Sequence, residues 1–288
     1  MDALADDGDA RVTPLRDGVA GRSLEGIVRA EVYLDPTVRV CVMPATGIHR
    51  SPDQRSEQMD QLLFGETFEV IEEEAGGFVW GQARRDGYVG FVRAHALAPP
   101  GAEPTHRICA LRTYAFAEAS IKSRAGGPYP MNALVAVEAQ EGRLAKVAGA
   151  GWMAAEHLGP VGLFETAPDG VPWAAVAERF LAAPYLWGGR ESLGLDCSGL
   201  VQQALFACGI ACPRDADQQA ELGREISRDE FGRGDLVFWK GHVAIGLDAD
   251  RIVHANGHHM MVAIEPLETA LTRIEAAGSG KATAFRRL

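Results

Sequence analysis

The sequence predicts a multidomain chain in which two small all-β units precede an α+β domain. Three observations lead to this fold class. Short alternating strand patterns fill the first half of the chain, and a proline-rich stretch, Pro99–Pro104, divides that half in two. After residue 163, helical periodicity is followed by consecutive strand patterns. A chain of 288 residues has room for two or three such domains.

Residues 1–25 lack sustained periodicity and are expected to form an extension on the surface. The first β unit is predicted over 26–99 and the second over 100–163, and their similar rhythm of strands and Gly or Asp turns suggests a diverged repeat. Strands are predicted in the first unit at 39–43, 67–71, 78–82 and 88–92, and in the second at 133–137, 144–147 and 151–153.

The α+β domain is predicted over 164–288. Pro172 is expected to open a helix capped by Asp169, because apolar residues recur at helical spacing from there to residue 181. A second helix is predicted over 197–208 and ends at Gly209. Three strands are predicted to follow, at 235–239, 242–247 and 251–255.

The composition excludes several classes of function and bears on the expected cellular compartment. With 47% hydrophobic residues and a net charge of −11, the chain fits a soluble globular protein that binds neither nucleic acid nor an anionic membrane surface. Five cysteines cannot form a complete disulfide framework. The acidic N-terminus lacks a signal-peptide pattern, and no run reaches membrane-spanning length, so a cytoplasmic location is expected, or a periplasmic or exported one if the N-terminus has been trimmed.

Cys197 is the predicted nucleophile. Asp196 is expected to cap the helix that Cys197 opens, so the thiol lies near free backbone donors, which favour a thiolate. With an imidazolium nearby, such a site lowers a thiol pKa from about 8.5 to roughly 3.5–7.5. The backbone N–H of Cys197 and the hydroxyl of Tyr185 are candidate oxyanion donors. Gly199, unfavourable in a helix, suggests close approach by another backbone or a substrate. The alternative is a small buried apolar cysteine.

His242 and His254 are the predicted base and orienting group. If residues 248–250 form a three-residue hairpin loop, Ala244 lies opposite His254, and the two histidines become diagonal neighbours on one face of the sheet. A loop that differs by one residue puts them on opposite faces, so the register stays open here. Each histidine alone also fits a structural role.

Two other readings of these residues compete with catalysis. His254, His258 and His259 could hold a metal ion, but their spacing lacks the pattern of a zinc site, so no metal or other cofactor is expected. A protein that only binds its ligand is the second alternative. The remaining cysteines, Cys41, Cys109, Cys208 and Cys212, are expected to be buried apolar residues.

Several motifs, in order, carry a resemblance to a known family. They are Pro184-Tyr-Leu-Trp-Gly-Gly189, Leu195-Asp-Cys-Ser-Gly-Leu-Val-Gln202, Pro213-Arg-Asp215, Gly234-Asp-Leu-Val-Phe-Trp239, Gly241-His-Val-Ala-Ile245 and Ile252-Val-His-Ala255. This segment resembles the NlpC family of bacterial cell-wall cysteine peptidases. The resemblance implies a papain-like core with Cys197 as nucleophile, His242 as base and His254 as the orienting residue. It also implies that Tyr185, Asp196 and Ser198 help to bind the amino end of the substrate.

The front of the chain resembles the two bacterial SH3-like domains of the recycling-type members. Those are γ-D-glutamyl-L-diamino-acid endopeptidases, which cut murein stem peptides that have a free N-terminal L-alanine. In them, a Glu and a Tyr of the first SH3-like domain recognise the free amine at one end of the groove. Glu57 and Tyr88 match best here, with Glu66 and Trp80 as competitors; a surface carboxylate and a barrel-packing aromatic are the structural alternatives.

The expected reaction is acyl transfer through a cysteine acyl-enzyme, with hydrolysis of the bond between D-glutamate and diaminopimelate or lysine. A carboxylate and an aromatic face suit a substrate ammonium group. A monomer that binds murein peptides is expected. The alternatives are an amidase or endopeptidase on intact peptidoglycan, an acyltransferase, and the binding protein named above.

Overall fold

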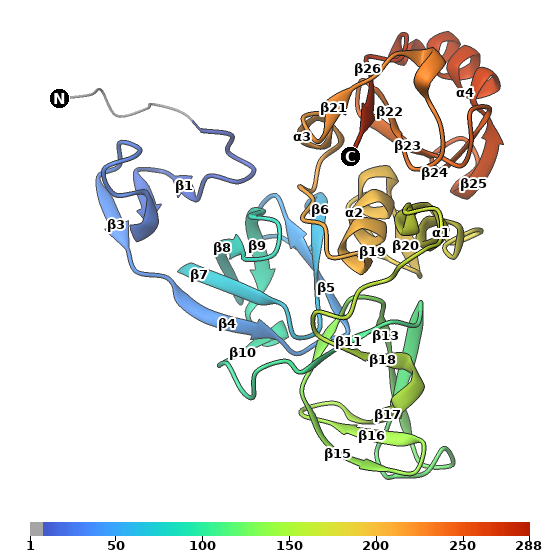
Figure 1. Cartoon of the computed structure of the whole chain (residues 1–288). Coiled ribbons are helices and arrows are strands. Elements are labelled where there is room, and N and C mark those ends of the chain that lie inside the picture. Colours follow the sequence, from blue (N-terminus) through green and yellow to red (C-terminus); the bar gives the residue numbers. More distant parts are fainter. Residues whose placement is uncertain (1–7) are drawn as a thin grey trace. The chain divides into compact units, whose positions relative to one another are not determined.

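The computed structural model describes residues 8–288 of the chain. The chain separates into two compact units, one up to Gly159 and one from Pro160 to Leu288. The first unit consists of β-strands with short 3-10 turns, and the second carries all four α-helices of the described chain (Figure 1). Each unit is described separately below.

A seven-stranded antiparallel sheet forms the first β module, with strand order β10-β4-β7-β8-β9-β5-β6. Apolar and polar residues alternate along β7, so that one face of the strand is buried. Phe68 and Val70 lie on the buried face, whereas the alternating Thr67 and Glu69 are partly exposed. The strands are β4 (Thr37–Cys41), β5 (Ala45–His49), β6 (Gln58–Leu63), β7 (Thr67–Glu74), β8 (Phe78–Ala83), β9 (Val89–Arg93) and β10 (Leu97–Ala98), with a 3-10 turn, η2 (Ala94–Ala96), before β10.

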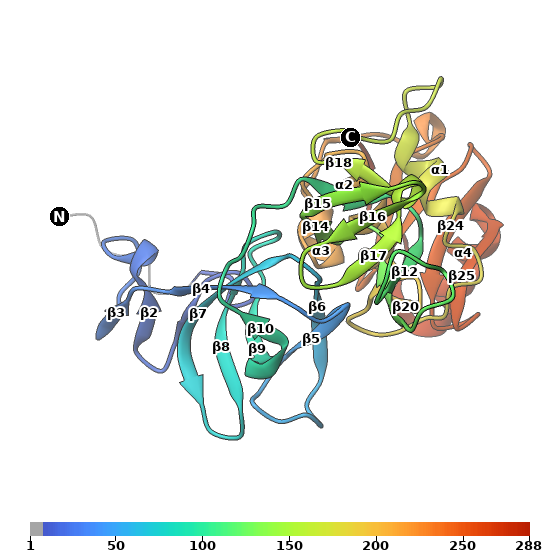
Figure 2. The same ribbon diagram turned by 90° about the horizontal axis from the view of Figure 1, so that it is seen from below.

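The second β module repeats this connectivity. Each strand pair of the first module has a counterpart: β4 corresponds to β11, β5 to β12, β6 to β13, β7 to β14 with β15, β8 to β16, β9 to β17 and β10 to β18. Both modules also place a 3-10 turn before the last strand. Figure 2 shows β15, β16 and β17 side by side. The second module differs in that β14 and β15 lie in separate sheets, of three and five strands. The corresponding pairing supports the repeat that the sequence rhythm suggests.

The bounds of the second module are β11 (His106–Ile108), β12 (Arg112–Phe116), β13 (Ala125–Pro130), β14 (Leu134–Val135), β15 (Val137–Glu141), β16 (Leu144–Val147), β17 (Gly151–Ala154), η3 (Ala155–His157) and β18 (Leu158–Pro160). The two modules share a hydrophobic core, in which Leu63 and Phe64 of the first pack with Tyr129 and Met153 of the second. Between them, the backbone N–H of Leu134 donates to the carbonyl of Phe64.

The N-terminal extension is more regular than the sequence predicts. Residues from 8 onward form a small sheet of β1 (Leu15–Arg16), β2 (Val19–Gly21) and β3 (Val32–Leu34), with η1 (Arg22–Leu24) between β2 and β3; residues 1–7 lie outside the described part. Arg16 anchors it, because its guanidinium pairs with Glu72 and Glu74 and lies 4.8 Å from the ring centroid of Trp80.

The C-terminal unit packs helices against a six-stranded antiparallel sheet of order β21-β26-β22-β23-β24-β25. The helices are α1 (Pro172–Glu178), α2 (Cys197–Ala207), α3 (Ala216–Gln219) and α4 (Leu267–Ile274). The strands of this sheet are β21 (Arg224–Glu225), β22 (Leu236–Trp239), β23 (His242–Gly246), β24 (Arg251–Asn256), β25 (Met261–Pro266) and β26 (Ala284–Arg287). A separate hairpin is formed by β19 (Arg190–Glu191) and β20 (Gly194–Leu195). The unit also contains the 3-10 turn η4 (Arg228–Glu230) and the π-turn η5 (Glu275–Ser279).

The C-terminal unit agrees with the sequence prediction in its central hairpin and differs from it in the cap of α1 and in three elements near the C-terminus. The hairpin between β23 and β24 has the three-residue loop, since Ile245 pairs with Val253 and the backbone N–H of Leu247 donates to the carbonyl of Arg251. The cap expected from Asp169 is wrong: Val171 is the N-cap residue of α1, and Asp169 instead accepts from the backbone N–H of Val171 in the turn before it. The sequence does not predict β25, α4 or β26.

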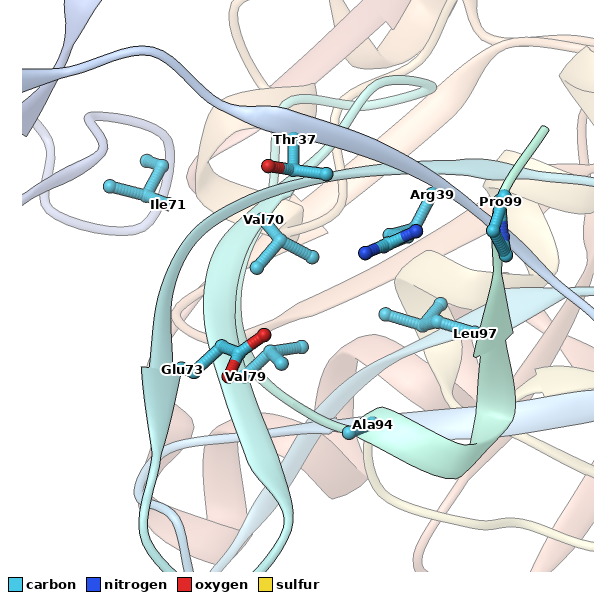
Figure 3. Close-up of a pocket in the computed structure, with 9 residues that line it drawn as sticks. All are labelled: Thr37, Arg39, Val70, Ile71, Glu73, Val79, Ala94, Leu97 and Pro99. Carbon is cyan, nitrogen blue, oxygen red and sulfur yellow. The ribbon is translucent and has the colours of Figure 1, made fainter.

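The first β module also carries a surface pocket of about 350 Å³ (Figure 3). Arg39 points into it, among the apolar side chains of Val70, Val79 and Leu97, and Glu73 lies at its edge. None of the predicted site residues lines it. Over residues 8–288, no helix combines the length and hydropathy that crossing a membrane requires.

Candidate active site

Cys197 is the first residue of α2, and the elements around it fix the start of that helix. Asp196 is the N-cap residue and accepts from the backbone N–H of Gly199 at 2.8 Å, as predicted. Helix α2 packs against β23 and β24, and the backbone N–H of Val243 in β23 donates to the sulfur of Cys197. The thiol is therefore held beside the residue that follows His242.

Gly199 owes its place to a close approach. A methyl group at this position would lie 2.2 Å from the carbonyl oxygen of Gly189, in the turn that precedes the helix. No side chain fits at that distance without movement of one backbone. The expectation that this glycine marks close approach by another backbone is confirmed.

We expect Gly199→Ala to destabilise the protein although alanine favours helices. The gain of about 1 kcal/mol in helix propensity opposes an overpacking cost of about 1–3 kcal/mol, which we expect to prevail because the contact is with backbone. Urea unfolding measures the difference. The matched control is Gly257→Ala, since a methyl group there meets no atom within 4 Å. Equal stability of the two variants would contradict the steric role.

Arg214 and Asp196 form a buried ion pair behind the thiol. Asp196 Oδ1 accepts from Nη1 of Arg214 at 3.0 Å and Oδ2 from Nη2 at 2.6 Å, and both side chains are nearly inaccessible. Oδ2 also accepts from the backbone N–H of Gly188 at 2.8 Å. Nη1 of Arg214 reaches Oγ of Ser198 at 2.8 Å. The carboxylate thus joins the Gly188 turn, the start of α2 and the Arg214 loop.

His242 and His254 meet side by side on the sheet. Nε2 of His242 lies 2.8 Å from Nδ1 of His254, so one of these nitrogens donates a hydrogen bond to the other. This contact follows from the register, which makes the two histidines diagonal neighbours on one face. Nδ1 of His242 takes no part in this contact. His254 is fully buried, and His242 is partly exposed.

The row of polar groups continues beyond the two histidines. Nε2 of His254 lies 2.8 Å from Oε1 of Glu265 in β25, off the alignment of an ideal hydrogen bond. Arg273 of α4 donates to the same carboxylate oxygen. Burial acts to raise the pKa of Glu265, but hydrogen bonds from His254 and Arg273 lower it to about 2. Glu265 is therefore ionised at neutral pH.

Burial dominates the electrostatics of the thiol and its base. It raises the pKa of Cys197 to about 12, with the negative charge of Asp196 adding to the effect. It lowers the pKa of His242 to about 3, assisted by His254 and Arg273. The sequence predicts that the helix N-terminus lowers the pKa of the thiol, but in the structure burial raises that pKa instead. Both groups rest neutral, and a thiolate can form here only together with the imidazolium that receives its proton.

Tyr185 and Ser198 lie beside this centre. Burial raises the pKa of the Tyr185 phenol, and the charges of Cys197 and Asp196 raise it further, which places the ring near both. The backbone of Tyr185 is fixed by its N–H, which donates to the carbonyl of Met260. Ser198 is 5% exposed, and its hydroxyl faces Asp196 and Arg214.

The two candidates for amine recognition lie in the first β module. Glu57 is exposed and pairs with Arg50 at 2.8 Å. Tyr88 is 2% exposed and belongs to the hydrophobic core of the module. Their competitors are engaged inside the module: the Glu66 carboxylate is buried against Arg85, and Trp80 is 2% exposed beneath Arg16.

The sequence predicts that the remaining cysteines are buried apolar residues, and the structure tests this prediction. None of the five cysteines forms a disulfide; Cys41 and Cys212 are buried as expected, whereas Cys109 and Cys208 are only partly buried. His254, His259 and Glu265 bring one ligand atom each within 4.8 Å of one another. Because Arg273 donates to that carboxylate, its positive charge opposes a cation at this place.

Two functional features escaped the sequence analysis. Arg214 belongs to the motif Pro213-Arg-Asp215, but the motif does not indicate what the arginine does. It lies in a loop, where the sequence has no periodicity that would indicate its burial. Glu265 lies in a strand that the sequence did not predict. The alternation of Val262 and Ile264 with Ala263 and Glu265 is the one available signal, and it points to a half-buried strand rather than to catalysis.

A thiol at a helix start, with a histidine pair on the adjoining sheet, defines the C-terminal unit as a cysteine-peptidase domain. Residues 182–276 match the NlpC/P60 family, and residues 48–97 match the bacterial dipeptidyl-peptidase SH3 domain. The chain therefore combines an NlpC/P60 cysteine-peptidase domain with an SH3-type domain ahead of it.

Two similar proteins are named dipeptidyl-peptidases. The chain is 25% identical over 246 residues to Dipeptidyl-peptidase 6 of Lysinibacillus sphaericus, which covers 75% of this chain and 87% of that protein. It is 38% identical over 84 residues to the γ-D-glutamyl-L-lysine dipeptidyl-peptidase of Bacillus subtilis, 26% of this chain and 28% of that protein.

A solved structure supports the fold across both units. The crystal structure of an NlpC/P60 family protein from Bacillus cereus matches with a TM-score of 0.73 at 18% identity, over 87% of this chain and 99% of that chain. At this identity the likeness establishes the fold alone.

Proposed function

We propose that this protein is a cysteine endopeptidase that hydrolyses the bond between γ-D-glutamate and the diamino acid of murein stem peptides. The observation that carries the chemistry is the arrangement of Cys197 at the start of α2 beside the paired His242 and His254. The bond is inferred from the names of two relatives, which are a dipeptidyl-peptidase and a γ-D-glutamyl-L-lysine dipeptidyl-peptidase.

The proposed reaction proceeds through an acyl-enzyme. Nδ1 of His242 takes the proton of the Cys197 thiol as the sulfur attacks the γ-carbonyl carbon of D-glutamate. The carbonyl oxygen becomes an oxyanion that the backbone N–H of Cys197 and the hydroxyl of Tyr185 stabilise. The tetrahedral intermediate then expels the diamino-acid amine, which receives the proton from His242. Water, deprotonated by His242, attacks the thioester, and the acid product and the thiol are released.

His254 acts in this scheme as the orienting residue. Its 2.8 Å contact with Nε2 of His242 holds the imidazole ring in place and leaves Nδ1 for the proton of the thiol. Because burial disfavours each isolated charge, the thiolate and the imidazolium form together during attack rather than before substrate binds.

We extend the proposal to substrates with a free N-terminal L-alanine. An ammonium group needs a nearby negative charge, and the groups that we propose for its recognition are Tyr185, Ser198 and Asp196, together with the exposed carboxylate of Glu57. Tyr88 is left out of this set because it is 2% exposed in the core of its module, which corrects the expectation from the sequence. Asp196 has both oxygens engaged by Arg214, Gly188 and Gly199, so its contribution is the field of a charge already paired, together with the placement of Ser198.

The second β module is proposed to be a second SH3-like barrel, since its strand pairing repeats that of the first. The chain would then consist of an extension over 1–25, SH3-like domains over 26–99 and 100–163, and a papain-like peptidase domain over 164–288. A monomer that acts in the cytoplasm on peptides recovered from the cell wall fits a requirement for a free amino end.

Selectivity for the free amine is the sharpest test of this function. We expect L-Ala-γ-D-Glu-meso-diaminopimelate to be cut between D-glutamate and the diamino acid, and its N-acetylated form at least about 100-fold more slowly, because the acetyl group removes the charge that the site is built to read. Mass spectrometry of both products measures the two rates. The matched control is the same peptide pair with lysine as diamino acid.

Each other outcome selects a different function. Cleavage of both peptides at equal rates removes the amine requirement and favours an endopeptidase or amidase on intact peptidoglycan. Binding of the free-amine peptide without cleavage, measured by calorimetry, favours a murein-peptide-binding protein. Cleavage at another bond contradicts the γ-D-glutamyl assignment.

A further inference from the structure

Beyond the thiol and the two histidines, we propose that Glu265 is a positioning residue that sets which nitrogens of His254 and His242 carry protons. The proposal rests on the catalytic roles assigned above to Cys197 and His242. Glu265 touches neither substrate nor thiol; it acts through His254. Arg273, which donates to the same carboxylate, holds it in place.

The sheet brings Glu265 to His254 by register. Strands β24 and β25 pair so that His254 lies opposite Ala263, which makes Glu265, two residues further along, its diagonal neighbour on the same face. Glu265 is only 7% exposed, and its Oε1 lies 2.8 Å from Nε2 of His254. A carboxylate buried this far needs positive or donor partners, and Arg273 and His254 are the two that it has here.

The protonation pattern follows from this contact. An ionised carboxylate only accepts hydrogen bonds, so Nε2 of His254 must carry the proton that faces it. Nδ1 of neutral His254 is then an acceptor, and the 2.8 Å contact requires Nε2 of His242 to be the donor. Nδ1 of neutral His242 is left with a lone pair. That is the nitrogen free to take a proton from Cys197.

The same hydrogen bonds, from His242 to His254 and from His254 to Glu265, also suit the state in which His242 is protonated. When His242 receives the proton from the thiol, both its nitrogens carry hydrogen, and Nε2 still needs an acceptor at His254. Burial disfavours the resulting imidazolium. The negative charge of Glu265 opposes that penalty across His254, whereas Arg273 adds positive charge on the same side. His259 also faces His254. Loss of the carboxylate therefore destabilises the thiolate–imidazolium pair that forms during attack.

The test compares Glu265→Gln with Glu268→Gln, a change of the same chemistry at an exposed glutamate of α4. We measure alkylation of Cys197 by iodoacetamide from pH 5 to pH 10, with the modified peptide quantified by mass spectrometry. In the wild type and in Glu268→Gln, Cys197 is expected to react at neutral pH through the ion pair. In Glu265→Gln, the rate at pH 7 is expected to fall about 10–100-fold, the scale on which partners that orient metal-binding histidines act.

The pH profile separates positioning from structural damage. Since the lone thiol of a variant without the ion pair must ionise by itself, its half-maximal rate is expected at least one pH unit higher, and the difference between the two variants is expected to narrow from pH 7 towards pH 10. Glu265→Asp, which keeps the charge, is expected to recover part of the neutral-pH rate. A Glu265→Gln profile equal to that of Glu268→Gln overturns the proposal. So does a uniform loss across all pH values accompanied by a lower melting temperature.

Peptide hydrolysis by the same variants keeps this proposal distinct from the proposed function. A wild-type protein that does not cut the γ-D-glutamyl peptide, yet shows the alkylation shift in Glu265→Gln, supports Glu265 and removes the substrate assignment. A wild type that cuts the peptide, with kcat unchanged in Glu265→Gln, supports the substrate assignment and overturns the role of Glu265. A loss confined to kcat, with KM unchanged, supports both.

Discussion

Cys197→Ala is expected to abolish hydrolysis of L-Ala-γ-D-Glu-meso-diaminopimelate, with a loss in kcat of about 10⁴-fold or more, the scale seen when a nucleophile that works as a unit with its base is removed. The physical reason is that the variant has no group able to form the acyl-enzyme. His242 stays in place because its contact with His254 does not involve the sulfur. Residual turnover would then come from a water molecule activated by the histidine.

The control for this prediction is Cys208→Ala. Cys208 is the C-cap residue of the same helix, so the two variants remove the same atom from opposite ends of α2. We expect Cys208→Ala to keep full activity. Rates are measured by mass spectrometry of the released dipeptide under substrate saturation, and binding of the uncut peptide to Cys197→Ala by calorimetry. Activity that survives in Cys197→Ala, or is lost in Cys208→Ala, would contradict the assignment of the nucleophile.

Local signals were enough to predict the helix that carries the thiol and the hairpin that carries the histidines. The start of α2 depends on a cap within one turn, and Asp196 supplies it. The hairpin register depends on the length of one loop, and its three-residue form brings His242 and His254 together. Each of these features is decided by residues within a dozen positions of one another, which is the range in which spacing is informative.

The partners that support the site could not be predicted in the same way. Arg214 reaches Asp196 across 18 residues, from a loop whose path has no period. Glu265 acts on His254 only because β25 pairs with β24 in one particular register. The raised pKa of Cys197 is also a tertiary effect, since burial outweighs the helix terminus on which the expectation of a lowered value was based. Contacts between distant segments decided all three.

The burial of Arg214 makes its removal the most damaging single change to stability that we expect in the peptidase domain. In Arg214→Leu, the carboxylate of Asp196, which is 5% exposed in the wild type, loses both guanidinium hydrogen bonds. An uncompensated buried charge costs about 3–5 kcal/mol. The Gly188 and Gly199 amides still donate to the carboxylate, so the cap persists while the charge is left without its counterion.

Thermal unfolding followed by near-ultraviolet circular dichroism measures this cost, with an expected decrease in Tm of roughly 2–4 °C for each kcal/mol. The control is Arg233→Leu, since Arg233 pairs with Asp169 and Glu178 while 31% of its side chain stays exposed, and such surface pairs contribute about 0–1 kcal/mol. Equal losses in the two arginine variants would contradict a special role for burial.

A double variant tests whether the uncompensated charge is the cause. Adding Asp196→Asn to Arg214→Leu removes the stranded charge and keeps an oxygen that can cap α2, so part of the lost stability is expected to return. If the loss of stability in the double variant, relative to wild type, instead equals the sum of the losses in the two single variants, the two residues act independently. The damage would then come from the cavity left by the arginine side chain, and the carboxylate would need no counterion to hold the helix that carries Cys197.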